Sequence, residues 1–280
     1  MKIYDCFRYC GEELLLNLRL KTLYNEVDKF VIIEGNKYYN GEIKKQLFDI
    51  NKFKDFKKKI DYYFIDNFPI YDFKNIEKSH WLYDDFHINK IELGLKDLND
   101  DDYVLISDLD EIPKLSNKEF LKNDSVVFLQ NMYYYKFNVH LYKGLKWNNK
   151  WAGTKGCKFK FFETARKVRE FRVRNIPWWR FDRKIKRQVL KDGGWHFSYL
   201  MNEEQIKLKL SRIPGEIEHL LRNNEDSKGQ LFDDKTIKSK LNNLIDPYGR
   251  NDIFLKKVEI DNSFPSYIND NIEKLSKYIA

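Results

Sequence analysis

Short apolar runs alternate with helical patterns over the first half of the chain. Four runs have the length and residue content of strands; they span residues 2–6, 29–34, 60–65 and 102–107. Between them, residues 12–24 place leucines at helical spacing, and residues 78–98 form a long amphipathic pattern. Because strands that alternate with helices favour parallel pairing, we predict an α/β fold with a mixed, mostly parallel sheet flanked by helices.

The second half of the chain follows a different pattern. Residues 125–139 form an aromatic, strand-like run that is longer than an ordinary strand, so we expect it to bend. Beyond residue 201 the pattern is mostly helical, and Asn202 is placed to cap a helix with Gln205 at the third helical position. Further helices are expected near Ile217, Lys235 and Ile272.

These patterns divide the chain at a soft boundary near residue 200. We predict an α/β domain over residues 1–200 and a helical extension over residues 201–280 packed on it, with one single domain as the alternative. The composition supports a large core, since 42% of the 280 residues are hydrophobic and 16% are aromatic. A disordered chain is therefore not expected.

Charge, cysteine content and the lack of long apolar runs narrow the class of protein further. No run of about 18 or more apolar residues occurs and the start lacks a signal-peptide pattern, so we expect a soluble chain without a transmembrane anchor. Three cysteines, an odd number, favour reduced thiols in a cytosol-like compartment. The net charge of +8 suits an anionic partner, either a small molecule or a polyanion.

The stretch from Tyr103 to Pro113 carries the clearest chemistry. An apolar strand delivers Asp108 and Asp110 to its carboxyl end, where open α/β sheets place their ligands. A turn at the end of the strand lets both carboxylates approach one divalent cation, which prefers carboxylate oxygens and bridges them to phosphate oxygens. The alternative is an acidic turn whose carboxylates are solvated.

Several blocks spread over residues 3–212 together resemble one enzyme family. They are Ile3 to Phe7 with Glu12, Leu15, Leu16 and Arg19; Val27 to Glu34 with Asn36 and Gly41; Asp102 to Pro113; Trp151 to Thr154; and Gly193 to Tyr199. In content and order these blocks resemble glycosyltransferase family 17, whose best-known members are the β-1,4-mannosyl-glycoprotein 4-β-N-acetylglucosaminyltransferases. At Arg8, Cys10 and Ile88 the chain departs from the family's pattern.

The resemblance implies a GT-A-like fold and an inverting, metal-dependent transfer of N-acetylglucosamine from UDP-GlcNAc to a glycan hydroxyl, with Mn²⁺ (or Mg²⁺) on the diphosphate. Asp110 is then expected to bind the ion directly, Asp108 to bind it through water or to hold the ribose, and Glu111 to support both in the catalytic site. His196 is a candidate third ligand, since manganese accepts an imidazole; its alternative is a buried histidine in an aromatic cluster. Without an anchor, such an enzyme fits a bacterial cytosol or the cytoplasm of a virus-infected host.

An inverting displacement also needs a general base on the acceptor hydroxyl, and it needs contacts to the nucleotide. As the base we choose Asp192, ahead of Glu163 and Asp182. Nucleotide contacts are expected from the ends of the first two strands, at Asp5, Phe7, Arg8, Glu34 and Asn36. Stacking on uracil is the expected role of Phe7, whereas strand-end capping is an equal alternative for Asp5 and Glu34.

Aromatic and basic residues later in the chain are weaker candidates for the same site. Trp195 is expected at the donor site, within an aromatic set that could stack on sugars or belong to the core; the others are Trp151, Trp178, Trp179 and Tyr199. The basic run from Arg180 to Arg187 is a candidate contact to the diphosphate, and its alternative is a solvated face.

Two other classes of protein remain as alternatives. The Asp108-x-Asp110 pair also resembles the nucleophile motif of haloacid-dehalogenase-like phosphatases, but three predicted strands precede it here. A basic nucleic-acid-binding protein would use the +8 charge and the aromatic residues, yet we find no nucleic-acid motif and expect no nucleic-acid partner. A sugar-nucleotide-binding protein without activity is a further alternative.

Overall fold

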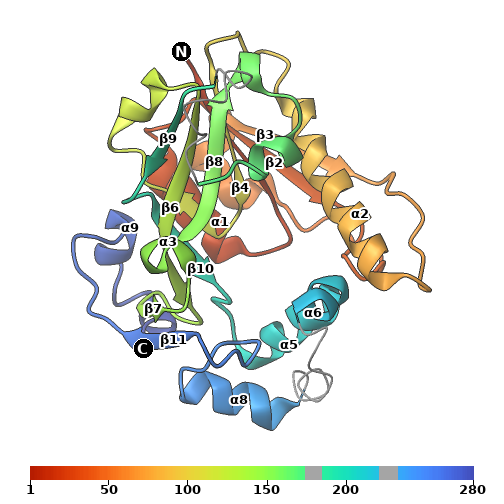
Figure 1. Cartoon of the computed structure of the whole chain (residues 1–280), viewed down its shortest axis with the longest axis vertical. Coiled ribbons are helices and arrows are strands. Elements are labelled where there is room, and N and C mark those ends of the chain that lie inside the picture. The colour runs from red at the N-terminus through yellow and green to blue at the C-terminus, as the bar shows by residue number, and fades with distance from the viewer. Residues whose placement is uncertain (174–184, 221–232) are drawn as a thin grey trace, which may run out of the picture.

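We describe the protein from a computed structural model, in which residues 1–173, 185–220 and 233–280 are defined (Figure 1). Parallel strands form one part of the sheet, in the spatial order β4 (Tyr103–Asp108), β1 (Ile3–Arg8), β2 (Lys29–Gly35) and β3 (Ile60–Ile65). These strands coincide with the four apolar runs of the sequence, so the predicted α/β fold is confirmed. The arrangement is GT-A-like.

The sheet continues beyond β4 with strands of both directions: β5 (Glu111–Pro113), β6 (Ser125–Tyr134), β7 (Val139–Lys143), β8 (Trp151–Lys158), β9 (Arg187–Leu190), β10 (Gly194–Ser198) and β11 (Phe254–Lys257). β8 runs antiparallel between β4 and β6, and β7 and β11 extend that edge. β9 and β10 pair in parallel with β6, and β5 pairs antiparallel with β10. The sheet is therefore mixed, as expected.

The long aromatic run bends where β6 meets β7. Tyr135, between the two strands, has a left-handed backbone with φ of 66°. That conformation is uncommon for a residue other than glycine, so neighbouring contacts must hold it. The Tyr135 N–H donates to the Ser198 carbonyl at 3.0 Å, and the Tyr135 hydroxyl donates to the Ile245 carbonyl at 2.7 Å. The predicted bend is confirmed.

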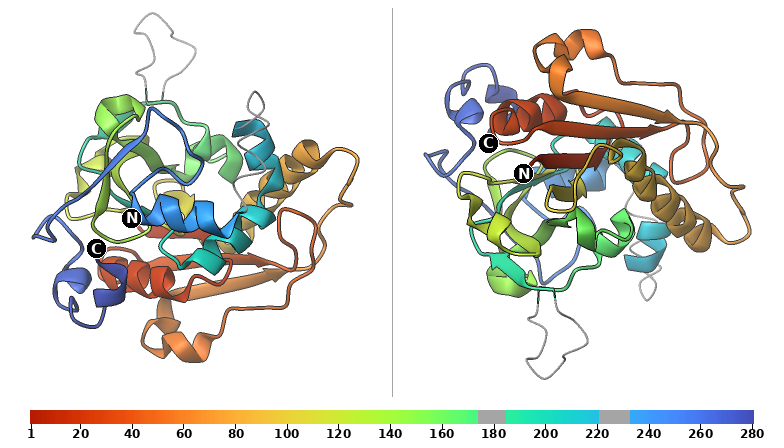
Figure 2. Two further views of the ribbon diagram at one scale, coloured as in Figure 1. Left: turned by 90° about the horizontal axis from the view of Figure 1, so that it is seen from below. Right: turned by 90° about the horizontal axis from the view of Figure 1, so that it is seen from above.

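Helices cover the sheet and close one of its ends. The α-helices are α1 (Glu13–Leu23), α2 (Ile76–Asn89), α3 (Lys146–Asn149), α4 (Ala165–Arg169), α5 (Glu203–Arg212), α6 (Pro214–Leu220), α8 (Asp234–Asn242) and α9 (Ser266–Asn269), and the 3-10 helices are η1 (Ile50–Lys59), η2 (Lys90–Gly94), η3 (Lys118–Lys122), η4 (Phe159–Phe161) and η5 (Ser276–Tyr278). In Figure 1, α5, α6 and α8 lie at the end of the sheet opposite the N-terminus. Figure 2 shows α6 beside α2.

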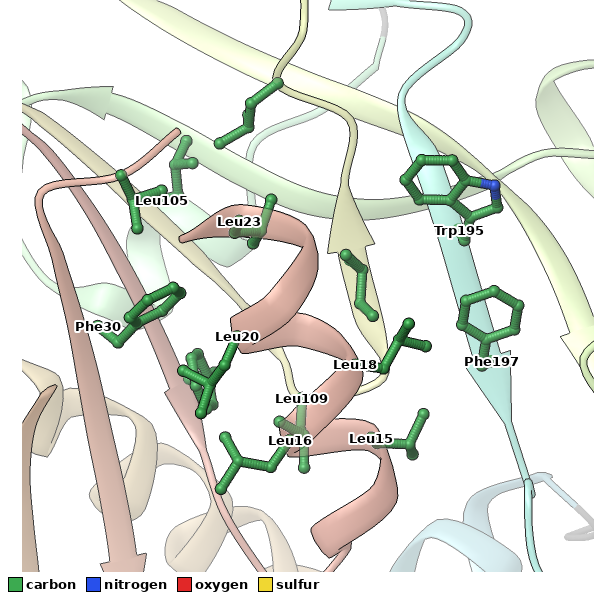
Figure 3. Close-up of a cluster of buried hydrophobic side chains, with 14 of the residues drawn as sticks. Leu15, Leu16, Leu18, Leu20, Leu23, Phe30, Leu105, Leu109, Trp195 and Phe197 are labelled. Atoms are coloured by element: carbon green, nitrogen blue, oxygen red, sulfur yellow. The ribbon is translucent and has the colours of Figure 1, made fainter. Parts of the chain in front are cut away.

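The leucines of α1 form the centre of the core (Figure 3). They pack with Phe30 of β2, Leu105 of β4 and Phe197 of β10, and all of these side chains are buried. Burial of each large apolar side chain contributes about 1.5–3 kcal/mol to stability. Phe264 and Ile268, from the C-terminal part of the chain, join the same cluster, so that part packs directly on the core of the α/β fold.

The helical prediction for the C-terminal part is only partly confirmed. α5 begins with the expected capping box, in which Asn202 and Gln205 exchange side-chain-to-backbone hydrogen bonds. Helices are present near Ile217 and Lys235, but Ile272 lies in a turn between α9 and η5. Asn and Asp before Ile272 are poor helix formers, which accounts for that error. β11 was also not predicted, because it forms only by pairing with β7.

The predicted helix over residues 78–98 is shorter than expected. α2 ends at Asn89, and the chain continues as η2 to Gly94. Gly94 lies directly against β2, where an added Cβ would be 2.5 Å from Val31 Cγ1. The missing side chain allows this approach, and the chain turns onto the sheet there.

Candidate active site

A pocket of about 510 Å³ opens at the carboxyl ends of β1 and β4. Arg8 is the last residue of β1 and Asp108 is the last residue of β4, and the parallel register sets them side by side. Open α/β sheets bind their ligands at this end of the strands. The pocket wall includes Arg8, Asp84, Asp108, Asp110, Glu111, Arg166, Arg169, His196, Lys209 and Glu216.

Beneath the pocket, Arg19 of α1 holds the acidic turn in place. Its buried guanidinium makes two bonds to Asp5, from Nε to Oδ2 at 2.7 Å and from Nη2 to Oδ1 at 2.6 Å. An arginine within a leucine-rich helix indicates a buried ion pair of this kind, because burying an unpaired charge is costly. The Arg19 guanidinium also donates hydrogen bonds to the acidic turn, at Ser107 Oγ and at the carbonyls of Asp108, Leu109 and Glu111.

Two arginines hold the carboxylate of Asp108 at the pocket. Oδ1 accepts from Arg8 Nη2 at 2.5 Å, and Oδ2 accepts from Arg169 Nη2 at 3.0 Å. Although burial opposes ionisation, Arg8 and Arg169 hold the pKa of Asp108 well below its usual value. The carboxylate is therefore charged at neutral pH, and its side chain is still 38% exposed.

Glu111 supports this arrangement from the core side. Its Oε2 accepts from the Asp108 N–H at 2.9 Å and from Arg169 Nη1 at 2.5 Å. Its Oε1 accepts from Trp151 Nε1 at 2.7 Å. Since Glu111 is only 1% exposed and both oxygens have partners, it acts as a positioning residue for Arg169 and for the turn.

The ion-pair network continues to α2 and α4 through Asp84. This carboxylate contacts both Arg8 and Arg166. Although burial favours the protonated form, these two guanidinium groups hold the pKa of Asp84 below its usual value. Asp84, Arg166 and Arg169 were not predicted from the sequence. The three-residue spacing of Arg166 and Arg169, which places both on one face of α4, was the available signal.

His196 reaches the acidic turn because of strand register. β10 pairs antiparallel with β5, which sets His196 opposite Glu111. The His196 Nε2 lies 3.4 Å from Asp110 Oδ2, and the imidazole ring lies 5.4 Å from the Trp151 ring. Although burial lowers the pKa of His196, the Asp110 carboxylate raises it to a net value above the usual one. His196 and Asp110 therefore form an interacting pair beside Asp108.

The predicted metal ligands do not form an assembled metal site. Carboxylate oxygens and an imidazole are suitable donors for manganese, and Asp108, Asp110 and His196 all face the pocket. Both oxygens of Asp108, however, contact arginines, and Asp110 contacts His196. Across residues 1–173, 185–220 and 233–280, no three His, Cys, Asp or Glu side chains lie close enough together to hold an ion. As arranged, the donors do not fit a metal ion.

Most of the residues predicted at the nucleotide lie inside the fold. Asp5 pairs with Arg19, and the Phe7 ring is fully buried 4.4 Å from that guanidinium. Glu34 is buried and accepts from Lys44 Nζ at 2.5 Å and from two backbone N–H groups. The Asn36 side chain donates to the Asp66 carbonyl at 3.1 Å. Of this predicted set, the structure brings only Arg8 to the pocket.

The remaining predicted residues lie away from the pocket or outside the described chain. Trp195 is 5% exposed and donates to the Ser263 carbonyl at 3.0 Å, on the core side of β10. Asp192 is exposed and pairs with Lys114 at 2.6 Å, and Glu163 is also exposed. Neither carboxylate lines the pocket. Asp182, Trp178, Trp179 and residues 180–184 of the basic run lie outside the described residues.

The wall facing the acidic turn comes from the C-terminal part of the chain. Lys209 of α5, Glu216 of α6, and Tyr248 and Arg250 of the loop before β11 all line the pocket. Tyr199, which follows β10 and has a left-handed backbone with φ of 54°, also lines it. Of these residues, only Tyr199 was predicted from the sequence, because the others belong to none of the recognised motifs.

The α/β fold and the pocket at its strand ends define a GT-A-like protein, and comparison with known proteins agrees. The family described as glycosyltransferase family 17 matches residues 1–213, and the chain belongs to that family. Two relatives, from Rattus norvegicus and Homo sapiens, are both named beta-1,4-mannosyl-glycoprotein 4-beta-N-acetylglucosaminyltransferase, and each is 26% identical over 225 residues. These matches cover 70% of this chain but only 40% of each relative. Among the described residues, no helix has the length and apolar content needed to cross a membrane.

Proposed function

We propose that this chain transfers N-acetylglucosamine from UDP-GlcNAc to a glycan hydroxyl, in an inverting reaction at the pocket where β1 and β4 end. The observation that carries the proposal is the charged pocket built around Asp108 and Asp110, within the part of the chain that matches family 17. The names of the relatives supply the donor sugar, and they supply a β-1,4-mannosyl glycan as the first acceptor to test.

Lys209 is the pocket cation best placed to meet the donor diphosphate. Arg8, Arg166 and Arg169 already pair with pocket carboxylates. The Lys209 ammonium lies 4.7 Å from the centre of the Tyr199 ring and makes no ion pair with a described carboxylate. Although burial lowers the pKa of Lys209, nearby carboxylates, above all Asp110, raise it to a net value above the usual one. A charged ammonium that lacks an ion pair with any described carboxylate is thus available for phosphate oxygens.

The chemistry required of the pocket is a single displacement at the anomeric carbon. The acceptor oxygen attacks that carbon as the bond to the diphosphate oxygen breaks, and negative charge grows on the departing UDP. Fixed cations near the developing charge stabilise it more than the ground state. Arg8 and Arg169 are held rigidly by Asp108 and Glu111, so with Lys209 they form the cationic side of the pocket.

Manganese or magnesium dependence is a separate proposal about this site. An ion bound by Asp108 and Asp110 would require Asp108 to exchange at least one arginine contact for the metal. No step given above depends on the ion. A bound divalent cation would add positive charge beside the diphosphate.

The proposed function is tested by product formation from a panel of donors. Purified protein is incubated with UDP-GlcNAc, UDP-glucose, GDP-mannose or dTDP-glucose and a glycopeptide that carries β-1,4-linked mannose, with manganese present. We expect a product heavier by one N-acetylglucosamine, and free UDP, with UDP-GlcNAc only. If no sugar nucleotide is consumed or bound, the proposal fails, and phosphatase and oligonucleotide-binding assays follow.

A parallel reaction with EDTA tests the metal independently. Loss of transfer that manganese restores supports metal dependence. Unchanged transfer would reject the metal proposal and leave the transferase proposal intact.

A further inference from the structure

The pocket is completed by residues that lie beyond the family match. The match ends at residue 213, whereas Glu216, Tyr248 and Arg250 line the same pocket as Asp108. The helix that carries Glu216 is held against α2. A Cβ at Gly215 would lie 2.4 Å from His80 Cβ, so only glycine allows this approach, and Ile213 and Ile217 are buried on either side. Glu216 therefore has a fixed place opposite the acidic turn.

Most carboxylates of the pocket already have an arginine or histidine partner. Asp84, Asp108 and Glu111 each contact at least one arginine, and Asp110 pairs with His196. A carboxylate held by a guanidinium is a weak base, because the arrangement stabilises its charged form. Two pocket carboxylates make no ion pair with a described residue: Glu12 and Glu216.

These two carboxylates differ in their partners. Glu12 precedes α1 on the side of β1, and its Oε2 accepts the backbone N–H of Cys10 at 3.0 Å. Glu216 Oε1 accepts from the Tyr248 hydroxyl at 3.1 Å, and the Tyr248 hydroxyl oxygen in turn lies 2.7 Å from the Tyr199 hydroxyl oxygen. Its Oε2 has no hydrogen-bond partner among the described residues. One oxygen of Glu216 is therefore positioned by tyrosines, and the other is available to a ligand.

The surroundings also make Glu216 more basic than an ordinary glutamate. Burial raises its pKa, and although Lys209 and Tyr248 oppose this effect, the net value is above the usual one. A general base works best when its pKa approaches the working pH, so the shift favours proton abstraction.

The side of the pocket around Glu216 suits a sugar. Tyr134, Tyr199 and Tyr248 line it, and their rings offer apolar faces while their hydroxyls offer hydrogen bonds. Carbohydrates present both an apolar ring face and hydroxyl groups. The arginines of the donor side lie at the ends of β1 and β4, and Lys209, which lies over the Tyr199 ring, joins that side to the tyrosines.

We propose that Glu216 is the general base that deprotonates the acceptor hydroxyl, on a glycan bound among Tyr134, Tyr199 and Tyr248. This proposal rests on the proposed transferase function. In the step, the acceptor oxygen forms a bond to the anomeric carbon, and its proton moves to Glu216 Oε2. The bond from that carbon to the diphosphate oxygen breaks, and UDP leaves with the electron pair. Glu216 then returns the proton to solvent, so no further reactant is needed.

The test compares Glu216→Gln with Glu218→Gln. Glu218 lies on the same helix but is exposed and does not line the pocket, so it is the matched control. We expect Glu216→Gln to slow transfer from UDP-GlcNAc to the β-1,4-mannosyl glycopeptide by at least about 100-fold at saturating substrate. Titration calorimetry should give a Kd for UDP-GlcNAc no more than about threefold weaker than wild type, since the substitution removes no cation from the donor side. Glu218→Gln should match wild type in both measurements.

Three outcomes would overturn the proposal. Transfer by Glu216→Gln at a rate close to wild type would remove Glu216 from the reaction. Loss of transfer in Glu12→Gln, with activity kept in Glu216→Gln, would assign the base to Glu12. A shift of donor Kd in Glu216→Gln equal to the loss of kcat/KM would show a binding role only. If wild type itself neither binds nor consumes UDP-GlcNAc, the proposed function has failed, and that result is distinct from the first three.

Discussion

Asp5 and Asp108 lie on neighbouring parallel strands, and arginine holds both, yet their surroundings differ. Asp5 has no exposed side-chain surface, and the guanidinium of Arg19 is saturated by its partners in the core. Asp108 is bound by Arg8 and Arg169 but is 38% exposed at the pocket. The completely paired Asp5 and Arg19 position the backbone in the core. The partly exposed Asp108 leaves its charge available to a ligand at the pocket. We therefore expect substitutions around Asp5 to change stability, and substitutions around Asp108 to change ligand binding.

The largest effect should follow from breaking the core network. Arg19→Met leaves the Asp5 carboxylate buried without its partner, which costs about 3–5 kcal/mol for a broken buried pair. Urea denaturation measures the change in the free energy of unfolding. Lys21→Met is the control, because Lys21 lies on the same helix but is exposed, and it should shift stability by about 0.5 kcal/mol or less. A loss below about 1 kcal/mol for Arg19→Met would contradict a stabilising role for this network.

Burial of His87 in α2 should make the protein less stable at acid pH. Burial, followed by the charge of Arg8, lowers the pKa of His87 to about 3, so the native state keeps it neutral. An unfolded histidine titrates near pH 6.5, so below that pH the unfolded state gains a proton that the native state does not. Stability should therefore be fully present above about pH 6.5 and fall toward pH 3, by up to about 1.4 kcal/mol per pH unit.

The measurement is the free energy of unfolding between pH 7 and pH 5 for wild type and His87→Gln. The variant should show a shallower loss with acidification, whatever its absolute stability. Parallel curves for the two proteins would mean that His87 does not titrate differently in the two states.

Much of the fold follows from local sequence, but the partners of buried charges do not. The four parallel strands and α1 were predicted because their apolar spacing is a local property. Asp5 and Glu34 were predicted as ligand contacts, with strand-end capping as an equal alternative, because they occupy the first two strands of an α/β fold. What decides their role is Arg19 and Lys44, which meet them only after folding. An arginine within a run of leucines was the visible sign of the first pair.

The candidate site likewise combines residues that sequence motifs predict with residues that only packing brings to the pocket. Arg8, Asp108, Asp110, Glu111 and His196 come together because strand register joins three segments that are far apart in sequence. Glu216 and Lys209 were missed because their helices reach the pocket through packing on α2 and on the end of the sheet, for which the sequence has no short motif. The base was therefore placed at Asp192, next to a recognised block.

The smallest effect is expected at Asp192. Its carboxylate is 70% exposed and pairs with Lys114 outside the pocket. An exposed ion pair contributes about 0–1 kcal/mol, so Asp192→Asn should leave stability almost unchanged. Transfer from UDP-GlcNAc should stay within about twofold of wild type, as expected for a surface substitution away from the site. If Asp192→Asn instead slowed transfer by about 100-fold or more, Asp192 would be restored as the base and Glu216 would not be needed.

The central claim, that a sugar nucleotide binds at the carboxyl ends of β1 and β4, is tested most directly by UDP-GlcNAc binding to Lys209→Met. Lys207→Met is the matched control, since Lys207 is exposed on the same helix and, within the described part of the chain, pairs with the exposed Asp234. Titration calorimetry needs no acceptor. Loss of one charge-assisted bond to phosphate costs about 1.5–3 kcal/mol, so the Kd of Lys209→Met should rise about 10-fold or more, while Lys207→Met should match wild type. Equal affinity for wild type and both variants, or no binding to any of them, would contradict the account.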